Sequence, residues 1–156
     1  MIVLTLLGLA GCSADCGQPD QVNGTYAVFA NVISAPEVSN EEAFPSYMSP
    51  VNGWTEWEIQ WNLVDQTQVV VLLDGQAYQA QGSWDSLECG RFDLKFQGDY
   101  TSVNDTEHAF VADGSFVVFG AHLDGVWAWS EIWTGRNAQS GTFAALGQVA
   151  GTRVSE

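Results

Sequence analysis

Residues 54–65, with the sequence WTEWEIQWNLVD, show the most regular alternation of apolar and polar side chains in this chain. In an extended strand, one face takes Thr55, Trp57, Ile59, Trp61 and Leu63, and the other takes Glu56, Glu58, Gln60 and Asn62. Such a pattern is typical of an antiparallel strand that has one buried face and one solvated face. The stretch therefore predicts a β fold with Trp57 and Trp61 packed in its core.

Further strand patterns lie on both sides of this stretch. Asp74-Gly75 separates two apolar runs as a tight hairpin would, and Asp113-Gly114 and Asp124-Gly125 predict two more hairpins. Strand-like runs cover residues 24–34, 67–84, 91–100 and 142–154. Because no long window shows helical periodicity, we expect an all-β domain.

The predicted turns bear on the architecture of this domain. Consecutive strands joined by short turns favour an antiparallel up-and-down barrel of about nine strands, with a β-sandwich as the alternative. In the rhythm of its strands the chain resembles lipocalin-like barrels. We assign residues 23–156 to a single all-β domain, because this length suffices for one core.

The charge of the chain is strongly negative. Nineteen Asp and Glu residues stand against four Lys and Arg residues, which gives a net charge of −15. Phosphate backbones need clustered Lys and Arg, so this composition excludes nucleic acid as a partner. We interpret the carboxylates as a solubilising surface, with adaptation to salty surroundings as a second interpretation.

The first residues carry a targeting signal. The apolar run from Ile2 to Leu9 is too short to span a bilayer as a helix, and small residues and Cys12 follow it. Leu9-Ala10-Gly11-Cys12 resembles the lipobox of bacterial lipoproteins, which implies cleavage before Cys12 and acylation of this residue with chains such as palmitate. We therefore interpret residues 1–11 as a lipoprotein signal peptide and residues 12–22 as a tether. The alternative is an apolar N-terminal strand in which Cys12 has no such role.

The same resemblance implies a location and a disulfide. Ser13 stands where an Asp would favour the inner membrane, so we expect anchoring in the outer membrane of a bacterial envelope. With Cys12 lipidated, Cys16 and Cys89 form an even pair in an oxidising compartment. We predict a disulfide between these two cysteines, and the alternative is two free thiols.

Residues 125–135, GVWAWSEIWTG, predict a candidate site. Trp127, Trp129, Glu131 and Trp133 occupy alternate positions and share one face of a strand. If Asp113-Gly114 and Asp124-Gly125 are two-residue loops, the register brings Asp105 and His122 to the same face. The opposite face would then form an ordinary core from Phe110, Val117, Phe119, Leu123, Val126 and Ile132.

This combination of side chains is typical of ligand binding. Indole rings edged by carboxylates and an imidazole suit a carbohydrate ring, and they also suit a small apolar ligand in the mouth of a barrel. We predict a ligand-binding face formed by Trp127, Trp129, Glu131, Trp133, His122 and Asp105, and we expect no cofactor. The alternative is a packed Trp core in a structural or interaction protein of the envelope.

Catalysis and metal binding have weaker support in the sequence. Neither histidine lies in an H-E-x-x-H or G-x-S-x-G motif, and we expect His108 to be a partly buried core residue. A hydrolase that uses Glu131 with Asp105 or His122 is a second alternative, and we assign no catalytic residue. The sequence lacks a C-x-x-C motif and a calcium-loop motif, so we expect no metal site.

Overall fold

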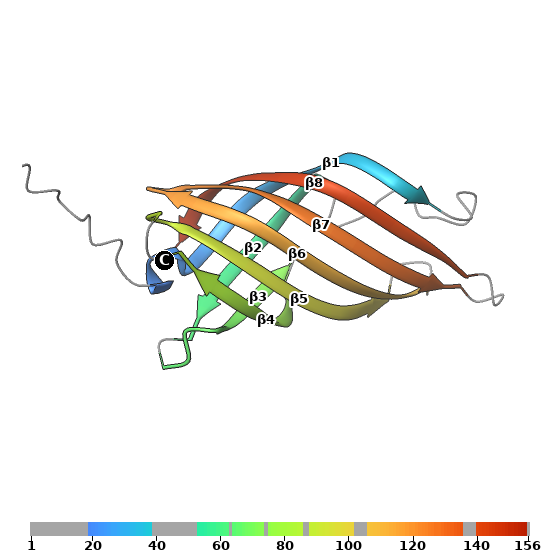
Figure 1. Ribbon diagram of the computed structural model, residues 1–156, viewed down its shortest axis with the longest axis horizontal. Helices are drawn as coiled ribbons and strands as arrows, with labels where there is room; N and C mark the ends of the chain where they lie inside the picture. Colours follow the sequence, from blue (N-terminus) through green and yellow to red (C-terminus); the bar gives the residue numbers. More distant parts are fainter. Residues whose placement is uncertain are drawn as a thin grey trace, which may run out of the picture.

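The computed structural model describes residues 19–38, 53–62, 64–73, 75–85, 88–101, 106–135 and 140–155. These residues form a closed antiparallel barrel of eight strands, in which each strand pairs with its neighbours in sequence and β8 pairs with β1 (Figure 1). The elements are η1 (Pro19–Val22, a 3-10 helix), β1 (Gly24–Val38), β2 (Gly53–Trp61), β3 (Gln68–Leu73), β4 (Gln76–Trp84), β5 (Arg91–Thr101), β6 (Glu107–Phe119), β7 (His122–Thr134) and β8 (Ser140–Ser155). The predicted all-β up-and-down barrel is confirmed, with one strand fewer than expected.

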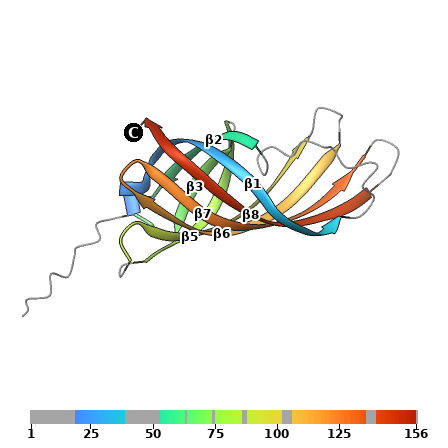
Figure 2. The same cartoon turned by 90° about the horizontal axis from the view of Figure 1, so that it is seen from above.

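The barrel is uneven in height. β8 has 16 residues and β3 has six, so β1 and β5–β8 project beyond β2–β4 at one end (Figures 1 and 2). We call this the long-strand end, which carries Thr101, Glu107, Thr134 and Ser140. The opposite end, which we call the η1 end, carries η1 and the last residue of β8, Ser155.

Two of the three predicted hairpins are wrong. Asp113-Gly114 lies inside β6 and Asp124-Gly125 lies inside β7, whereas the chain reverses at Gly120-Ala121. There Phe119 pairs with His122, and Gly120 has a φ of +60°, which glycine adopts without strain. The third prediction is confirmed, because Leu73 pairs with Gln76 across the turn that contains Gly75.

A close approach between neighbouring strands explains the two glycines inside β6 and β7. A Cβ on Gly114 would lie 2.6 Å from the ring of Phe116, and a Cβ on Gly125 would lie 2.3 Å from the same ring. Phe116 is the residue paired with Gly125 across the two strands. Both glycines thus make room for an aromatic ring in the interior, and neither turns the chain.

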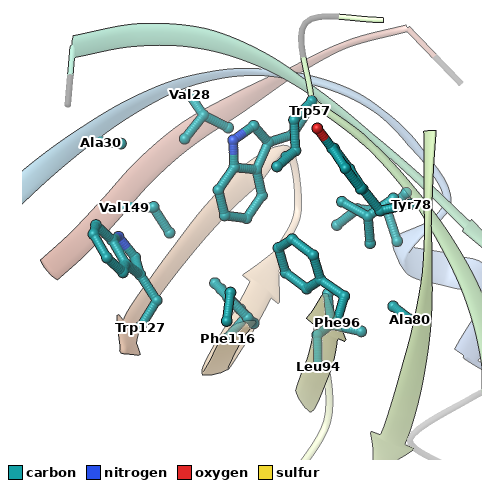
Figure 3. Packing of buried hydrophobic residues seen from close by; sticks show 14 of the residues in the cluster. Val28, Ala30, Trp57, Tyr78, Ala80, Leu94, Phe96, Phe116, Trp127 and Val149 are labelled. Carbon is teal, nitrogen blue, oxygen red and sulfur yellow. The ribbon is translucent and has the colours of Figure 1, made fainter. Parts of the chain in front are cut away.

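Inward-pointing side chains fill the barrel. Trp57, Ile59 and Trp61 are buried, as the alternation of residues 54–65 predicts. Phe92 stacks on Phe116 and Phe110 stacks on Trp129, with ring centroids 5.6 and 4.1 Å apart. Figure 3 shows part of this aromatic packing, with Trp57, Phe96, Phe116 and Trp127 around a common space.

The core predicted for β6 and β7 is corrected by the observed register. Phe110 and Leu123 point inward and are buried, but Val117, Phe119, Val126 and Ile132 lie on the outer face with 40 to 83% of their surface exposed. An Asp-Gly turn would have put residues 123 and 126 on the same face. Because β7 runs straight through this pair, the two positions lie on opposite faces.

The η1 end is held by a contact between the first and last strands. Tyr26 is fully buried, and its hydroxyl donates a 2.8 Å hydrogen bond to the carbonyl of Val22 in η1. Arg153 of β8 donates to the Tyr26 hydroxyl and to the carbonyl of Gln21, both at 2.7 Å, and its guanidinium lies over the Tyr26 ring. Burial raises the pKa of Tyr26, although the hydrogen bond and charge of Arg153 act in the opposite direction.

Candidate functional site in the barrel interior

The four predicted site residues on β7 share one face, and that face points into the barrel. Trp127, Trp129, Glu131 and Trp133 are all buried, with at most 6% of their surface exposed. Strand alternation places them there, because each second residue of β7 faces the interior. The indoles are therefore not an exposed shelf on the surface of the barrel.

The two other predicted members do not join this face in the described structure. His122 is exposed on the outer side of the barrel, because the chain turns at Gly120-Ala121 and not at Asp124-Gly125. Asp105 lies outside the described residues. The same holds for Cys12 and Cys16, so the lipidation and the disulfide with Cys89 remain predictions.

Glu131 is the centre of a buried polar cluster. Its Oε2 accepts a 2.9 Å hydrogen bond from the indole N–H of Trp129 and a 3.1 Å hydrogen bond from the hydroxyl of Tyr100. Its Oε1 pairs with Nδ1 of His108. A buried carboxylate is costly unless it is paired and hydrogen-bonded, and Glu131 has both kinds of partner.

His108 was predicted as a partly buried core residue, and its burial is confirmed, but its place in this polar cluster was not predicted. It lies on β6 directly opposite Trp133 of β7. Its buried side chain contacts that of Glu131, which is paired with Phe110, the next inward residue of β6. Tyr100, opposite His108 on β5, stacks on the imidazole at 4.5 Å with nearly parallel rings. The even-numbered residues of β6 from His108 to Phe116 all face the interior. Reading residues 107–119 as one continuous strand could therefore have predicted that His108 faces the same interior as Glu131.

Several buried polar atoms in the barrel interior have no hydrogen-bond partner among the described residues. Within the part of the chain that the structure describes, the indole N–H groups of Trp57, Trp127 and Trp133 have no hydrogen-bond partner, and neither has Nε2 of His108. An unsatisfied buried polar group costs about 1–3 kcal/mol. Such atoms are rare in protein interiors and require an explanation at each position.

A small cavity adjoins the cluster. It has a volume of about 20 Å³ and is lined by apolar surface from Trp57, Leu73, Phe96, Ala112, Phe116, Trp127 and Trp129, with Asp113 also contributing to its wall. Trp129 joins the two features, since its ring lines the cavity and its N–H binds Glu131. The site is thus an aromatic interior with one polar cluster on its long-strand side (Figure 3 shows the aromatic part).

Tyrosine 78 borders the same interior from β4. Its ring contacts those of Phe96 and Phe110, with centroids 6.2 and 5.1 Å away. Burial raises the pKa of Tyr78, and the charge of Asp99 raises it further. Its hydroxyl is therefore a neutral group at physiological pH.

The chemistry of the cluster is that of an oriented imidazole. When a carboxylate accepts a hydrogen bond from the Nδ1–H of a histidine, it fixes the orientation of the ring. Nε2 then remains as the nitrogen that can bind another group. Among the described residues no hydroxyl or thiol bonds to Nε2 of His108. The described ranges also contain no group of three or more His, Cys, Asp or Glu residues that could hold a metal ion.

In the described parts of the chain, no helix has the length and apolar character needed to cross a bilayer. Comparison with known proteins finds no protein-family model, no curated protein and no solved structure that matches this chain.

Proposed function

We propose that this protein binds a small, predominantly apolar molecule inside the barrel, against the face formed by Trp127, Trp129, Glu131 and Trp133. The observation that carries the proposal is the set of buried donors without acceptors in an otherwise aromatic interior. A core that served packing alone would have no use for them, because each costs free energy of folding. A ligand that carries oxygen would supply the missing acceptors.

The burial of the indoles favours an apolar ligand over an oligosaccharide. Sugar-binding aromatic residues offer a flat, accessible ring, whereas the Trp129 ring is stacked on Phe110 at 4.1 Å. The surface that lines the central cavity is apolar. Most hydroxyls of a sugar would therefore lose their hydration there without finding a partner.

The charge of the chain favours a neutral ligand over a fatty acid. Glu131 lies in the interior, and the whole chain carries a net charge of −15. A ligand carboxylate near Glu131 would meet a like charge in a region of low dielectric constant, where such repulsion is strong.

A packed-core envelope protein is the second candidate, and the size of the cavity favours it. A volume of about 20 Å³ holds roughly one water molecule. Binding of even a single aromatic ring would require the side chains around the cavity to move. The two candidates therefore differ in whether the interior admits a ligand.

Titration of the intact protein with anisole, decanoate and maltotetraose tests the proposal, with tryptophan fluorescence as the signal. We expect saturable binding of anisole only, and tighter binding by Leu73→Ala, because this substitution enlarges the cavity. Leu94→Ala is the matched control, since Leu94 is buried but does not line the cavity. Absence of a saturable change with anisole in both the natural protein and Leu73→Ala would leave the packed core as the better candidate.

We further propose that the barrel is tethered to the bacterial envelope, outer membrane rather than inner, through a lipid on Cys12. The support is the sequence Leu9-Ala10-Gly11-Cys12. Metabolic labelling with palmitate in a bacterial host tests this, and Cys12→Ala should abolish both the label and the membrane fraction. Cys16→Ala is the control, because it leaves the lipobox intact.

A further inference from the structure

We infer that His108 and Trp133 together form a recognition site for a hydroxyl group, and that the ligand of the barrel is a neutral alcohol or phenol. This inference rests on the proposed binding function and adds the chemistry of the ligand. It starts from two buried polar atoms, Nε2 of His108 and Nε1 of Trp133, that have no partner among the described residues.

The two residues are neighbours on the inner face of the barrel. His108 on β6 is directly paired with Trp133 on β7. Directly opposite residues of an antiparallel pair have Cβ atoms about 4.5–5.5 Å apart, so both side chains border the same part of the barrel interior. Both residues are at least 97% buried, which rules out bulk water as the permanent partner of either atom.

The surroundings hold the imidazole in place. Nδ1 of His108 is engaged by Glu131, Tyr100 covers one face of the ring, and Glu131 is itself fixed by Trp129. Nε2 is therefore the one nitrogen that remains for a ligand. Gly141, paired with Trp133 on β8, lets the indole lie flat, since a Cβ there would come within 2.5 Å of the ring.

A hydroxyl satisfies both atoms in either charge state of His108. When the imidazole is neutral, a ligand hydroxyl donates to Nε2 and accepts from the indole N–H of Trp133. When the imidazole is protonated, the same oxygen accepts from both. An ether or ketone oxygen can only accept, and a carboxylate would bring a second negative charge close to Glu131.

Three single-ring probes separate these chemistries: phenol, anisole and benzoate. Each is titrated into the intact protein and followed by calorimetry and by the indole N–H signals in NMR spectra. We expect phenol to bind roughly tenfold more tightly than anisole, the effect of one buried hydrogen bond pair. The N–H signal of Trp133 should move downfield with phenol, and benzoate should bind most weakly.

Trp133→Phe removes the donor and keeps an aromatic ring at the site. It should weaken the binding of phenol and of anisole by a similar factor, roughly tenfold, because both oxygens accept from the indole N–H. The preference for phenol should remain, since it comes from donation to Nε2 of His108. Trp61→Phe is the matched control, because the N–H of Trp61 already donates to the carbonyl of Gln66. This control should leave the affinity for both probes nearly unchanged.

The outcomes distinguish the inference from the function on which it rests. Binding of none of the three probes would overturn the proposed function and the inference with it. Equal binding of phenol and anisole, with no movement of the Trp133 signal, would overturn the hydroxyl site alone. Preference for benzoate would replace it with an anion site and overturn the inference as well.

Discussion

Glu131 is a carboxylate in an aromatic interior, and its three contacts make it the residue whose loss we expect to be most disruptive. Glu131→Gln keeps the shape of the side chain but presents an amide to Nδ1 of His108, while Trp129 and Tyr100 lose a charged acceptor. Breaking a buried pair by changing one partner costs about 3–5 kcal/mol. We expect a decrease of that size in the free energy of unfolding, measured by urea titration.

The matched control for this prediction lies one residue before His108. Glu107 is an exposed carboxylate on the outer face of β6, and Glu107→Gln should change the free energy of unfolding by less than about 0.5 kcal/mol. A double-mutant cycle of Glu131→Gln with His108→Phe should show coupling between the two sites. Additive effects would mean that the pair contributes nothing to stability.

The sequence analysis correctly predicted that Glu131 shares a face with the indoles, but it predicted His122 as the neighbouring histidine, where the structure has His108. Alternation along β7 was sufficient to put Glu131 with Trp127, Trp129 and Trp133. The partner from the next strand depends on the register, and a misplaced turn exchanged His108 for His122. When a site is formed by residues from neighbouring strands, one error in the predicted register changes its predicted members, because every residue of the strand is then paired with a different neighbour.

Strands were predicted correctly where the alternation of apolar and polar residues within the strand itself determines which side chains are buried. β2 and β5 alternate without interruption, and their inward residues are the buried ones. β6 and β7 contain Asp-Gly pairs, which are the usual local signal of a hairpin. The ring of Phe116 that requires glycine at positions 114 and 125 is a three-dimensional constraint, and no local pattern reveals it.

This difference between the glycines leads to a prediction for asparagine substitutions. Gly120 has a positive φ and open space around it, and asparagine tolerates that conformation. We expect Gly120→Asn to cost less than about 1 kcal/mol. Gly125→Asn should cost more than about 2 kcal/mol, because a Cβ there collides with Phe116 and with the carbonyl of Ser115. Thermal unfolding of both variants measures the difference, and equal costs would contradict the observed turn.

The η1 end should make the barrel sensitive to alkaline pH. Burial raises the pKa of Tyr26 above its ordinary value of about 10. The unfolded chain therefore releases this proton first, and the stabilising contribution, complete below about pH 10, is lost as the pH rises through the folded-state pKa. We expect the free energy of unfolding to fall as the pH rises above about 10.

Tyr26→Phe identifies the residue responsible. It should flatten this alkaline decline, and at pH 8 it should cost about 1–2 kcal/mol, because the hydrogen bonds to Val22 and Arg153 are lost. Tyr78→Phe serves for comparison, since burial and Asp99 also raise the pKa of that hydroxyl. An unchanged decline in Tyr26→Phe would show that another group titrates.

The whole molecule combines a largely aromatic interior with a strongly acidic exterior. On β5 the outward positions include Arg91, Asp93, Lys95 and Asp99, and β2 presents Glu56 and Glu58. The long strands β8 and β1 present no charged side chain on the outer face between positions 140 and 155 and between 25 and 34. Among the described residues, the outward carboxylates are therefore concentrated on the other strands of the barrel, where they repel one another.

Composition was sufficient to predict this balance of charge, but not the location of the aromatic residues. Seven tryptophans fit an exposed binding shelf as well as a filled barrel. Only the closure of the sheet by pairing of β1 with β8 places the β7 indoles inside. Closure is a property of the complete set of strands, which explains why a single strand could not decide between the two.

Self-repulsion of the acidic exterior leads to a prediction about salt. A net charge of −15 destabilises the compact state, and salt reduces this effect because the Debye length falls from about 30 Å at 0.01 M to about 3 Å at 1 M. We expect the midpoint of thermal unfolding at pH 8 to rise over this range of NaCl. The same series at pH 4.5, close to the isoelectric point of about 4.1, should show a much smaller rise, because fewer carboxylates are ionised. An equal rise at both pH values would assign the effect to burial of apolar surface, which salt also strengthens, and not to charge.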